Sequence, residues 1–124
     1  MKKILVIDDI KNNLILIKSI LKKQFPDFEI LTANSGQDGL KKAIREMPQS
    51  ILLDIYMPDI DGYQVCKELK KNDETKNIPI LMISAYGGDS KVRVKGLNAG
   101  ADAFISKPFH MEELVALVNV MLRI

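Results

Sequence analysis

Five short apolar runs alternate along this chain with five segments that carry the 3.6-residue period of an amphipathic helix. The run at 51–53 shows the pattern: it is apolar throughout, ends on Asp54, and is followed by the breakers Pro58 and Gly62. Strands are therefore expected at Lys3–Asp8, Glu29–Ala33, Ser50–Asp54, Ile80–Ser84 and Ala103–Ser106. Helices are expected at Lys11–Gln24, Gln37–Glu46, about 62–71, about 90–99 and Met111–Leu122.

This alternation predicts an α/β fold. Strands that are apolar throughout and separated by helices form a parallel sheet that is covered on both faces. With right-handed crossovers, five strand–helix units give an open, doubly wound, five-stranded sheet, and the order 2-1-3-4-5 of a flavodoxin-like fold is common at this size. The 124 residues contain no repeat or linker, so one domain is expected over 1–124.

Composition excludes several classes of protein. The chain is 47% apolar and 27% charged with a net charge of +2, and no Lys/Arg block is longer than two residues, which argues against direct nucleic-acid binding. The lone Cys66 excludes an internal disulfide and a multi-cysteine metal site. Lys2 and Lys3 precede only four apolar residues, too few for a signal peptide or a membrane span. A cytoplasmic protein without membrane contact is expected.

Chemically active side chains stand where four of the expected strands end. The first strand ends at Asp8-Asp9, the third at Asp54, the fourth at Ser84, and the fifth at Ser106-Lys107. In open parallel sheets, ligands bind outside the carboxyl ends of the strands, near the point where the strand order reverses. Three carboxylates, a hydroxyl and an ammonium group are thus expected at one edge of the sheet.

This combination suits phosphoryl transfer. Three adjacent carboxylates repel one another, and a divalent cation with oxygen ligands, such as Mg²⁺, removes that repulsion. Asp54 could then act as a nucleophile toward phosphorus, because carboxylates form acyl phosphates. Mg²⁺, Lys107 and Ser84 would supply the positive charge and hydrogen bonds that phosphoryl oxygens need.

Over essentially its whole length the sequence resembles the receiver domain of two-component response regulators. The resemblance rests on motifs that occur in order and at the family's spacings, namely Asp8-Asp9, Asp54 with Met57-Pro58 and Asp61-Gly62, Ser84-Ala85, Gly100-Ala101-Asp102, and Lys107-Pro108-Phe109. It implies a signalling switch that catalyses only its own phosphorylation and dephosphorylation. A histidine kinase or histidine phosphotransfer protein would supply the phosphoryl group, and an output domain or partner protein would respond.

The resemblance also implies a role for each matched residue. Asp54 corresponds to the phosphoacceptor and Lys107 to the lysine that pairs with the phosphate. Asp9 corresponds to a direct Mg²⁺ ligand and Asp8 to an acid that reaches the metal through water. The remaining matches are the Tyr56 backbone carbonyl as a metal ligand, the Ser84 hydroxyl that moves onto the phosphoryl group, and Phe104 as the switch aromatic.

Plainer interpretations stay open for several of these residues. The Asp8-Asp9 pair could cap the helix that follows it, and Ser84 could be an ordinary hydroxyl at a strand end. Lys107 alone would be a solvated surface lysine, and Phe104 a core aromatic. On the expected fourth helix, the charges of Lys91, Arg93 and Lys95 are more typical of a solvated face, although that face could border a homodimer formed on phosphorylation.

Two features suggest further hypotheses. Tyr56 and Tyr86 each follow a site residue by two positions, and their rings are expected to shield an acyl phosphate from water. Ile15 points away from the apolar stripe of its helix and Leu16 lies at the edge of that stripe, so they are either scattered surface residues or a docking patch for the phosphodonor.

Two other functions compete with the switch. A phosphatase with an aspartyl-phosphate intermediate would need a cap or substrate pocket, for which 124 residues leave no room. A flavin-binding module would need a phosphate loop after the first strand, where Asp8-Asp9 would repel phosphate. The chain is expected to be either a stand-alone receiver or, slightly favoured, a fragment or a receiver with a separate output partner.

Overall fold

The computed structural model describes residues 2–124, and within them the strands form one parallel sheet. The strand order is β2-β1-β3-β4-β5, so the predicted doubly wound sheet of order 2-1-3-4-5 is confirmed. The strands are β1 Lys3–Ile7, β2 Glu29–Ala33, β3 Ser50–Asp54, β4 Ile80–Ser84 and β5 Ala103–Ser106. The first strand therefore ends one residue earlier than predicted, which places Asp8 in the loop that follows β1.

The helices also lie within one residue of their predicted ranges. They are α1 Lys11–Gln24, α2 Gly36–Glu46, α3 Gly62–Lys71, α4 Ser90–Asn98 and α5 Met111–Leu122. The predicted cap of α3 is present, because the Asp61 carboxylate accepts a hydrogen bond of 2.9 Å from the Gln64 amide. In the same way Ser35 caps α2 by accepting from the Asp38 amide. None of these helices is long and apolar enough to cross a membrane, over the residues that the structure describes.

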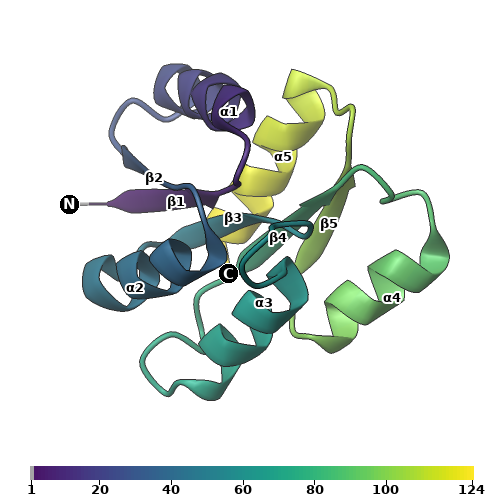
Figure 1. Ribbon diagram of the computed structural model, residues 1–124. Coiled ribbons are helices and arrows are strands. Elements are labelled where there is room, and N and C mark those ends of the chain that lie inside the picture. The colour runs from purple at the N-terminus through teal and green to yellow at the C-terminus, as the bar shows by residue number, and fades with distance from the viewer. Residues whose placement is uncertain (1) are drawn as a thin grey trace.

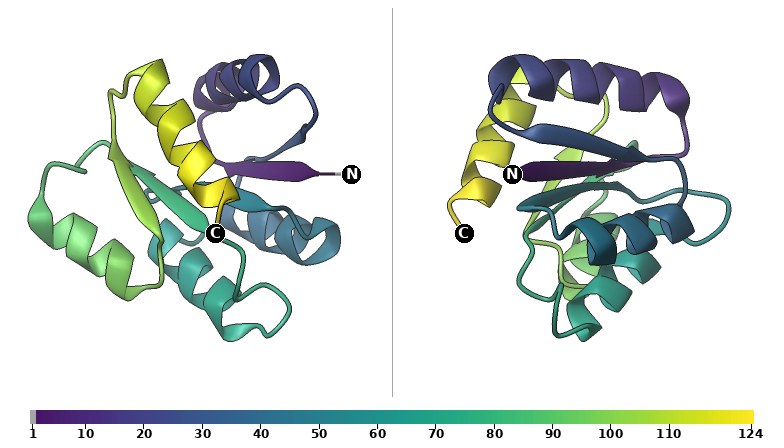
Figure 2. Two further views of the ribbon diagram at one scale, coloured as in Figure 1. Left: turned by 180° about the vertical axis from the view of Figure 1, so that it is seen from behind. Right: turned by 90° about the vertical axis from the view of Figure 1, so that its left-hand side faces the viewer.

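Helices cover both faces of the sheet (Figure 1). Helices α1 and α5 lie together on one face, and α2, α3 and α4 lie on the other, which Figure 2 shows with the sheet seen nearly edge-on. Each face has its own apolar core, and the central strand β3 contributes to both: Leu52 packs toward α1 and α5, while Ile51 and Leu53 pack toward the other three helices. Residues 50–54 are therefore all buried, as a continuously apolar strand requires.

The loop after β3 is folded tightly back on its own strand. The Gly62 amide donates a hydrogen bond of 2.6 Å to the Ile55 carbonyl oxygen. A Cβ at residue 62 would lie 2.5 Å from the Asp54 carbonyl oxygen, so only glycine permits this approach. The loop from Ile55 to Asp61 is thereby fixed at both ends beside Asp54.

Candidate functional site: an acidic cluster at the carboxyl edge of the sheet

Three carboxylates meet where β1 and β3 end. Oxygen atoms of Asp8, Asp9 and Asp54 all lie within 4.8 Å of one another. Asp8 is 1% exposed and Asp54 is 4% exposed, so little water reaches either group. The predicted convergence of strand ends is present in the structure, because β1 and β3 are hydrogen-bonded neighbours at the centre of the sheet.

Asp8 is held by the start of α1. One of its oxygens accepts from the Ile10 amide at 2.9 Å, and the other accepts from the Asn13 side chain at 3.1 Å. The plainer interpretation, in which the Asp8-Asp9 pair caps α1, is wrong for Asp8, because Ile10 takes the N-cap position and Asp8 bonds to the Ile10 amide and the Asn13 side chain rather than to an amide of the first turn. These two bonds hold Asp8 beside Asp9 and Asp54.

Asp9 differs from Asp8 in having an unsatisfied oxygen. Its Oδ1 atom is buried and has no hydrogen-bond partner within the described residues. A buried carboxylate oxygen without a partner is costly, and such a group in a native structure calls for an explanation such as an ion. Together with Asp8 and Asp54, this carboxylate offers hard oxygen donors of the kind that Mg²⁺ prefers, and that ion binds through one or two carboxylates and keeps several waters. The donor set therefore fits the cation expected from the sequence.

Lys107 brings positive charge to the cluster from the loop after β5. Its ammonium nitrogen lies 3.0 Å from Asp54 Oδ1 and 3.5 Å from Asp8 Oδ2. The lysine follows β5, two strands away from β3, and its amide donates to the Ser84 carbonyl oxygen at 2.8 Å. Burial by itself would lower the pKa of Lys107, but the hydrogen bonds and charges of Asp54 and Asp8 outweigh it and raise that pKa.

The surroundings also raise the pKa of Asp54, but for an aspartate a higher pKa means that the charged form is disfavoured. Burial raises the pKa of Asp54 to about 6; the hydrogen bond from Lys107 works against this rise, whereas the charges of Asp8 and Asp9 add to it. The carboxylate is thus less stable in its charged form than an exposed aspartate. A bound cation would relieve both the repulsion and part of the burial cost.

Ser84 lies at the end of β4 and is fully buried. Its hydroxyl oxygen accepts a hydrogen bond of 2.9 Å from the Tyr86 amide. Phe104, in β5, is partly buried and packs against the core shared with α2, α3 and α4. Its ring fills the space beside Gly96, where a Cβ would lie 2.7 Å from Phe104 Cε2.

Two tyrosine rings stand near the mouth of the cluster. Tyr56 and Tyr86 are 47% and 63% exposed, and their rings meet edge to face with centroids 5.4 Å apart and planes at 90°. This geometry is a favourable one for aromatic pairs. The pair joins the loop after β3 to the loop after β4.

The surface beside the acidic cluster carries the apolar residues singled out in the sequence, Ile15 near Asp9 and Leu16 near Lys107. Ile15 and Leu16 are 56% and 54% exposed. Leu16 also lines a cavity of about 290 Å³ between α1 and the loop after β5, together with Asn13, Ile17, Lys107, Pro108 and Phe109. Hydrophobic surface therefore lies directly beside the acidic cluster.

One anchoring residue was not predicted from the sequence. Asp59 accepts hydrogen bonds from the Gly36 amide at 3.1 Å and the Gln37 amide at 2.8 Å, so it caps α2 from the loop after β3. The cap lies 23 residues from Gly36 in the sequence, whereas the usual cap signal is local. Its neighbour Ile60 packs close to Gly36, which fixes the loop against α2.

The fold and site agree with the relationships of this chain to known proteins. Residues 4–119 match the family model described as the response regulator receiver domain, and the chain belongs to that family. It is a receiver domain of two-component signalling, which is not a family of catalytic enzymes, and the family predicted from the motifs is confirmed.

Individual relatives are moderately similar. The chain is 39% identical over 121 residues to the response regulator PleD of Caulobacter vibrioides, covering 98% of this chain and 26% of PleD. It is 38% identical to the alkaline phosphatase synthesis transcriptional regulatory protein PhoP of Bacillus subtilis, covering 98% of this chain and 49% of PhoP. The chain thus spans between a quarter and a half of these curated relatives.

The fold is shared with solved structures. The chemotaxis protein CheY4 of Vibrio cholerae superposes with a TM-score of 0.90 at 27% identity, covering 98% of this chain and 99% of that one. The predicted flavodoxin-like arrangement is confirmed by this likeness and by the strand order.

Proposed function

We propose that the protein is a signalling switch that accepts a phosphoryl group on Asp54 in a Mg²⁺-dependent reaction. The observation that carries the proposal is the contact of 3.0 Å between the Lys107 ammonium and Asp54 Oδ1, at a point where Asp8 and Asp9 converge. A carboxylate oxygen that is close to an ammonium and to a cation site is suited to attack phosphorus while its neighbours hold the phosphoryl oxygens.

Each residue has a defined part in this reaction. Asp54 attacks the phosphorus, the bond from phosphorus to the donor nitrogen breaks, and an acyl phosphate forms. Asp9 and the backbone carbonyl of Tyr56 would hold Mg²⁺ and Asp8 would contribute through water, and the ion would supply positive charge to the phosphoryl oxygens. Lys107 exchanges its contact with Asp54 for one with a phosphoryl oxygen, and the Ser84 hydroxyl donates a hydrogen bond to another phosphoryl oxygen.

Phosphorylation changes the surface formed by α4, β5 and α5, and partners recognise the changed surface. Movement of Ser84 toward the phosphoryl group leaves space at the end of β4, and Phe104 on the neighbouring strand moves into that space. A histidine kinase or histidine phosphotransfer protein supplies the phosphoryl group, and an output domain, a partner protein or a second phosphorylated copy binds the altered surface. The receiver family supports a kinase and an output as classes of partner.

Incubation with Mg²⁺ and acetyl phosphate tests the proposal. The parent protein should gain the mass of one phosphoryl group, and Asp54→Asn should not, whereas Asp27→Asn, at an exposed loop position, should behave like the parent. Equal modification of Asp54→Asn and the parent would contradict the assignment. Sustained release of inorganic phosphate from many donors would instead indicate the phosphatase alternative, and visible absorbance would indicate a flavin protein.

Donor docking beside the site has its own test. Ile15→Asp should slow phosphoryl transfer from a histidine-phosphorylated donor but leave phosphorylation by acetyl phosphate unchanged, because a small donor needs no docking surface. Ile44→Asp is a matched control, since Ile44 is 44% exposed but lies on α2, on the opposite side of the sheet. Equal loss with both donors would show that Ile15 acts on the site rather than on docking.

A further inference from the structure

Helix α4 is held to the rest of the protein by few contacts. Gly96 is its only buried residue, and Val92 is partly buried against the neighbouring core. The large apolar side chains Val94 and Leu97 are exposed, at 54% and 50%. A helix that buries little apolar surface belongs to the less stable part of a fold, so individual polar contacts weigh heavily in holding it.

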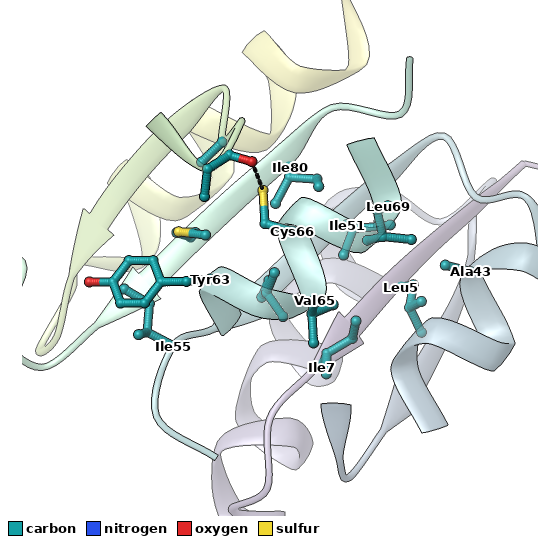
Figure 3. Packing of buried hydrophobic residues seen from close by; sticks show 14 of the residues in the cluster. Leu5, Ile7, Ala43, Ile51, Ile55, Tyr63, Val65, Cys66, Leu69 and Ile80 are labelled. Carbon is teal, nitrogen blue, oxygen red and sulfur yellow. Dashed lines mark hydrogen bonds between the residues drawn. The ribbon is translucent and has the colours of Figure 1, made fainter. Parts of the chain in front are cut away.

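Tyr63 on α3 supplies two of those contacts. Its hydroxyl donates a hydrogen bond of 3.3 Å to the Val92 carbonyl oxygen in the first turn of α4. One turn further along α4, the Lys95 ammonium lies 4.5 Å from the centre of the Tyr63 ring, which is a cation–π contact. A third contact from α3 to the end of α4 joins the Cys66 thiol to the Ala99 carbonyl oxygen at 3.4 Å. Figure 3 shows Tyr63 and Cys66 both projecting from α3, with this thiol bond drawn as a dashed line.

Tyr63 also lies next to the loop that carries the expected metal ligand. The ring is 6% exposed, and the amide of the preceding residue, Gly62, donates to the Ile55 carbonyl oxygen at 2.6 Å, directly before Tyr56 in the chain. Tyr56 in turn meets Tyr86 edge to face, and the Tyr86 amide donates to the Ser84 hydroxyl oxygen. The start of α3, which carries Tyr63, therefore contacts the loop that carries Tyr56, and the Tyr56 ring in turn meets Tyr86 beside Ser84.

We propose that Tyr63 is a positioning residue that holds α4 in the observed arrangement and, through the contact of its helix with the Tyr56 loop, makes that arrangement depend on what the site binds. Binding at the site would shift the loop that carries the Tyr56 carbonyl and would move Ser84 off the Tyr86 amide. Both changes shift the Tyr56–Tyr86 ring pair, and the Tyr63 hydroxyl leaves Val92. This connection between the site and α4 runs through α3. It is separate from the contact between Phe104 on β5 and Gly96 on α4.

The first test measures α4 without any ligand. Amide hydrogen exchange of residues 90–98 should be roughly 2- to 10-fold faster in Tyr63→Phe than in the parent, the factor expected for the loss of one hydrogen bond. Phe keeps the ring, so the core stays filled. Lys95→Gln should also speed exchange by removing the cation–π contact, whereas Lys91→Gln on the same helix, at a position with no such contact, should not. Unchanged exchange in Tyr63→Phe would overturn the proposal.

The second test measures coupling, which a merely structural role would not produce. If the Tyr63 hydroxyl favours the observed arrangement of α4 over the arrangement with beryllofluoride bound, its removal must tighten binding of beryllofluoride with Mg²⁺ by the factor by which that preference is lost, because coupling between two sites is reciprocal. Beryllofluoride affinity should therefore rise roughly 2- to 10-fold in Tyr63→Phe. Equal affinity in variant and parent would contradict the coupling.

This inference rests on the proposed function, and the two fail differently. If the parent protein binds no beryllofluoride, the phosphorylation proposal is wrong, while the exchange of α4 in Tyr63→Phe still reports on whether Tyr63 holds that helix. If the parent binds beryllofluoride and Tyr63→Phe binds it equally well, phosphorylation stands and the role of Tyr63 in transmitting it is wrong.

Discussion

Asp54 and Lys107 illustrate how single residues of the site depend on one another. Each would lose its charge more readily if it were buried alone, and each keeps the other ionised at a distance of 3.0 Å. Removal of either partner leaves an uncompensated charge in a site that water barely reaches. The remaining acids, Asp8 and Asp9, make the cluster net negative, so an arriving cation or phosphoryl group meets an ordered set of charges.

The exposed ring of Tyr86 gives a prediction about phosphoryl lifetime. Tyr86→Ala should shorten the half-life of the phosphorylated protein by up to about tenfold, because the edge-to-face pair with Tyr56 is lost and water gains access to the acyl phosphate. The half-life is measured as loss of the phosphoryl mass after the donor is removed. Tyr86→Phe, which keeps the ring, should retain the parent half-life. A Tyr86→Ala protein that hydrolyses no faster would refute the shielding role.

Cys66 gives a prediction about chemical reactivity and pH. Burial raises the pKa of its thiol from 9.0 to about 11, so the reactive thiolate is scarce in the folded protein at pH 8. Iodoacetamide should therefore modify Cys66 only after denaturant is added. Because the folded pKa is the higher one, the stabilisation linked to this thiol is complete below pH 9 and is lost as pH rises through about 11. Rapid labelling without denaturant would contradict this expectation.

At the scale of the element, α4 depends on one glycine for its contact with the sheet. Gly96 lies inside the helix, where glycine is expected to cost about 1 kcal/mol relative to alanine. The structure shows what offsets this cost. A Cβ at residue 96 would lie 2.7 Å from the Phe104 ring and 2.8 Å from the Met82 sulfur, so alanine would push α4 away from β5.

Gly96→Ala should therefore destabilise the protein although alanine favours helix. The expected loss in the free energy of unfolding is about 1–2 kcal/mol, an overpacking cost reduced by the gain in helix propensity. Gly88→Ala is the matched control, since nothing lies within 4 Å of a Cβ at that position, and its change should stay within about 0.5 kcal/mol. Urea unfolding measures both. A more stable Gly96→Ala protein would show that α4 shifts without cost.

Elements and site differ in how far the sequence predicts them. The strands follow from apolar runs and the helices from periodicity, so their limits agree with the structure to within one residue. The meeting of Asp8, Asp54 and Lys107 follows from strand order, because parallel strands all end at one edge. Contacts between side chains of different elements cannot be predicted from these patterns. The bond from Tyr63 to Val92 joins residues 29 apart, and it depends on the packing of two helices that no local pattern describes.

At the scale of the whole molecule, the acidic cluster joins segments that are distant in the chain. Lys107 and Asp8 are 99 residues apart and are brought together only by the complete sheet. A cation held among the carboxylates that meet beyond the ends of β1 and β3 therefore binds the folded protein and not the unfolded chain. Ligands with this preference stabilise the fold in proportion to the logarithm of their concentration.

Mg²⁺ should accordingly raise the free energy of unfolding of the whole protein. At one hundred times the dissociation constant the gain should be about 2.7 kcal/mol, measured by urea unfolding with Mg²⁺ and with EDTA. In Asp9→Asn the gain should vanish, because the carboxylate with the unpartnered buried oxygen is removed. The same variant should be more stable than the parent in EDTA, since one of three repelling charges is gone.

Asp27→Asn separates this effect from general charge screening. Asp27 is exposed in the loop between α1 and β2, so its loss changes the net charge by the same amount without touching the cluster. The variant should keep the full stabilisation by Mg²⁺. If Asp9→Asn and Asp27→Asn responded equally to Mg²⁺, the ion would be acting on the overall charge of the protein rather than through a site at the carboxyl edge of the sheet.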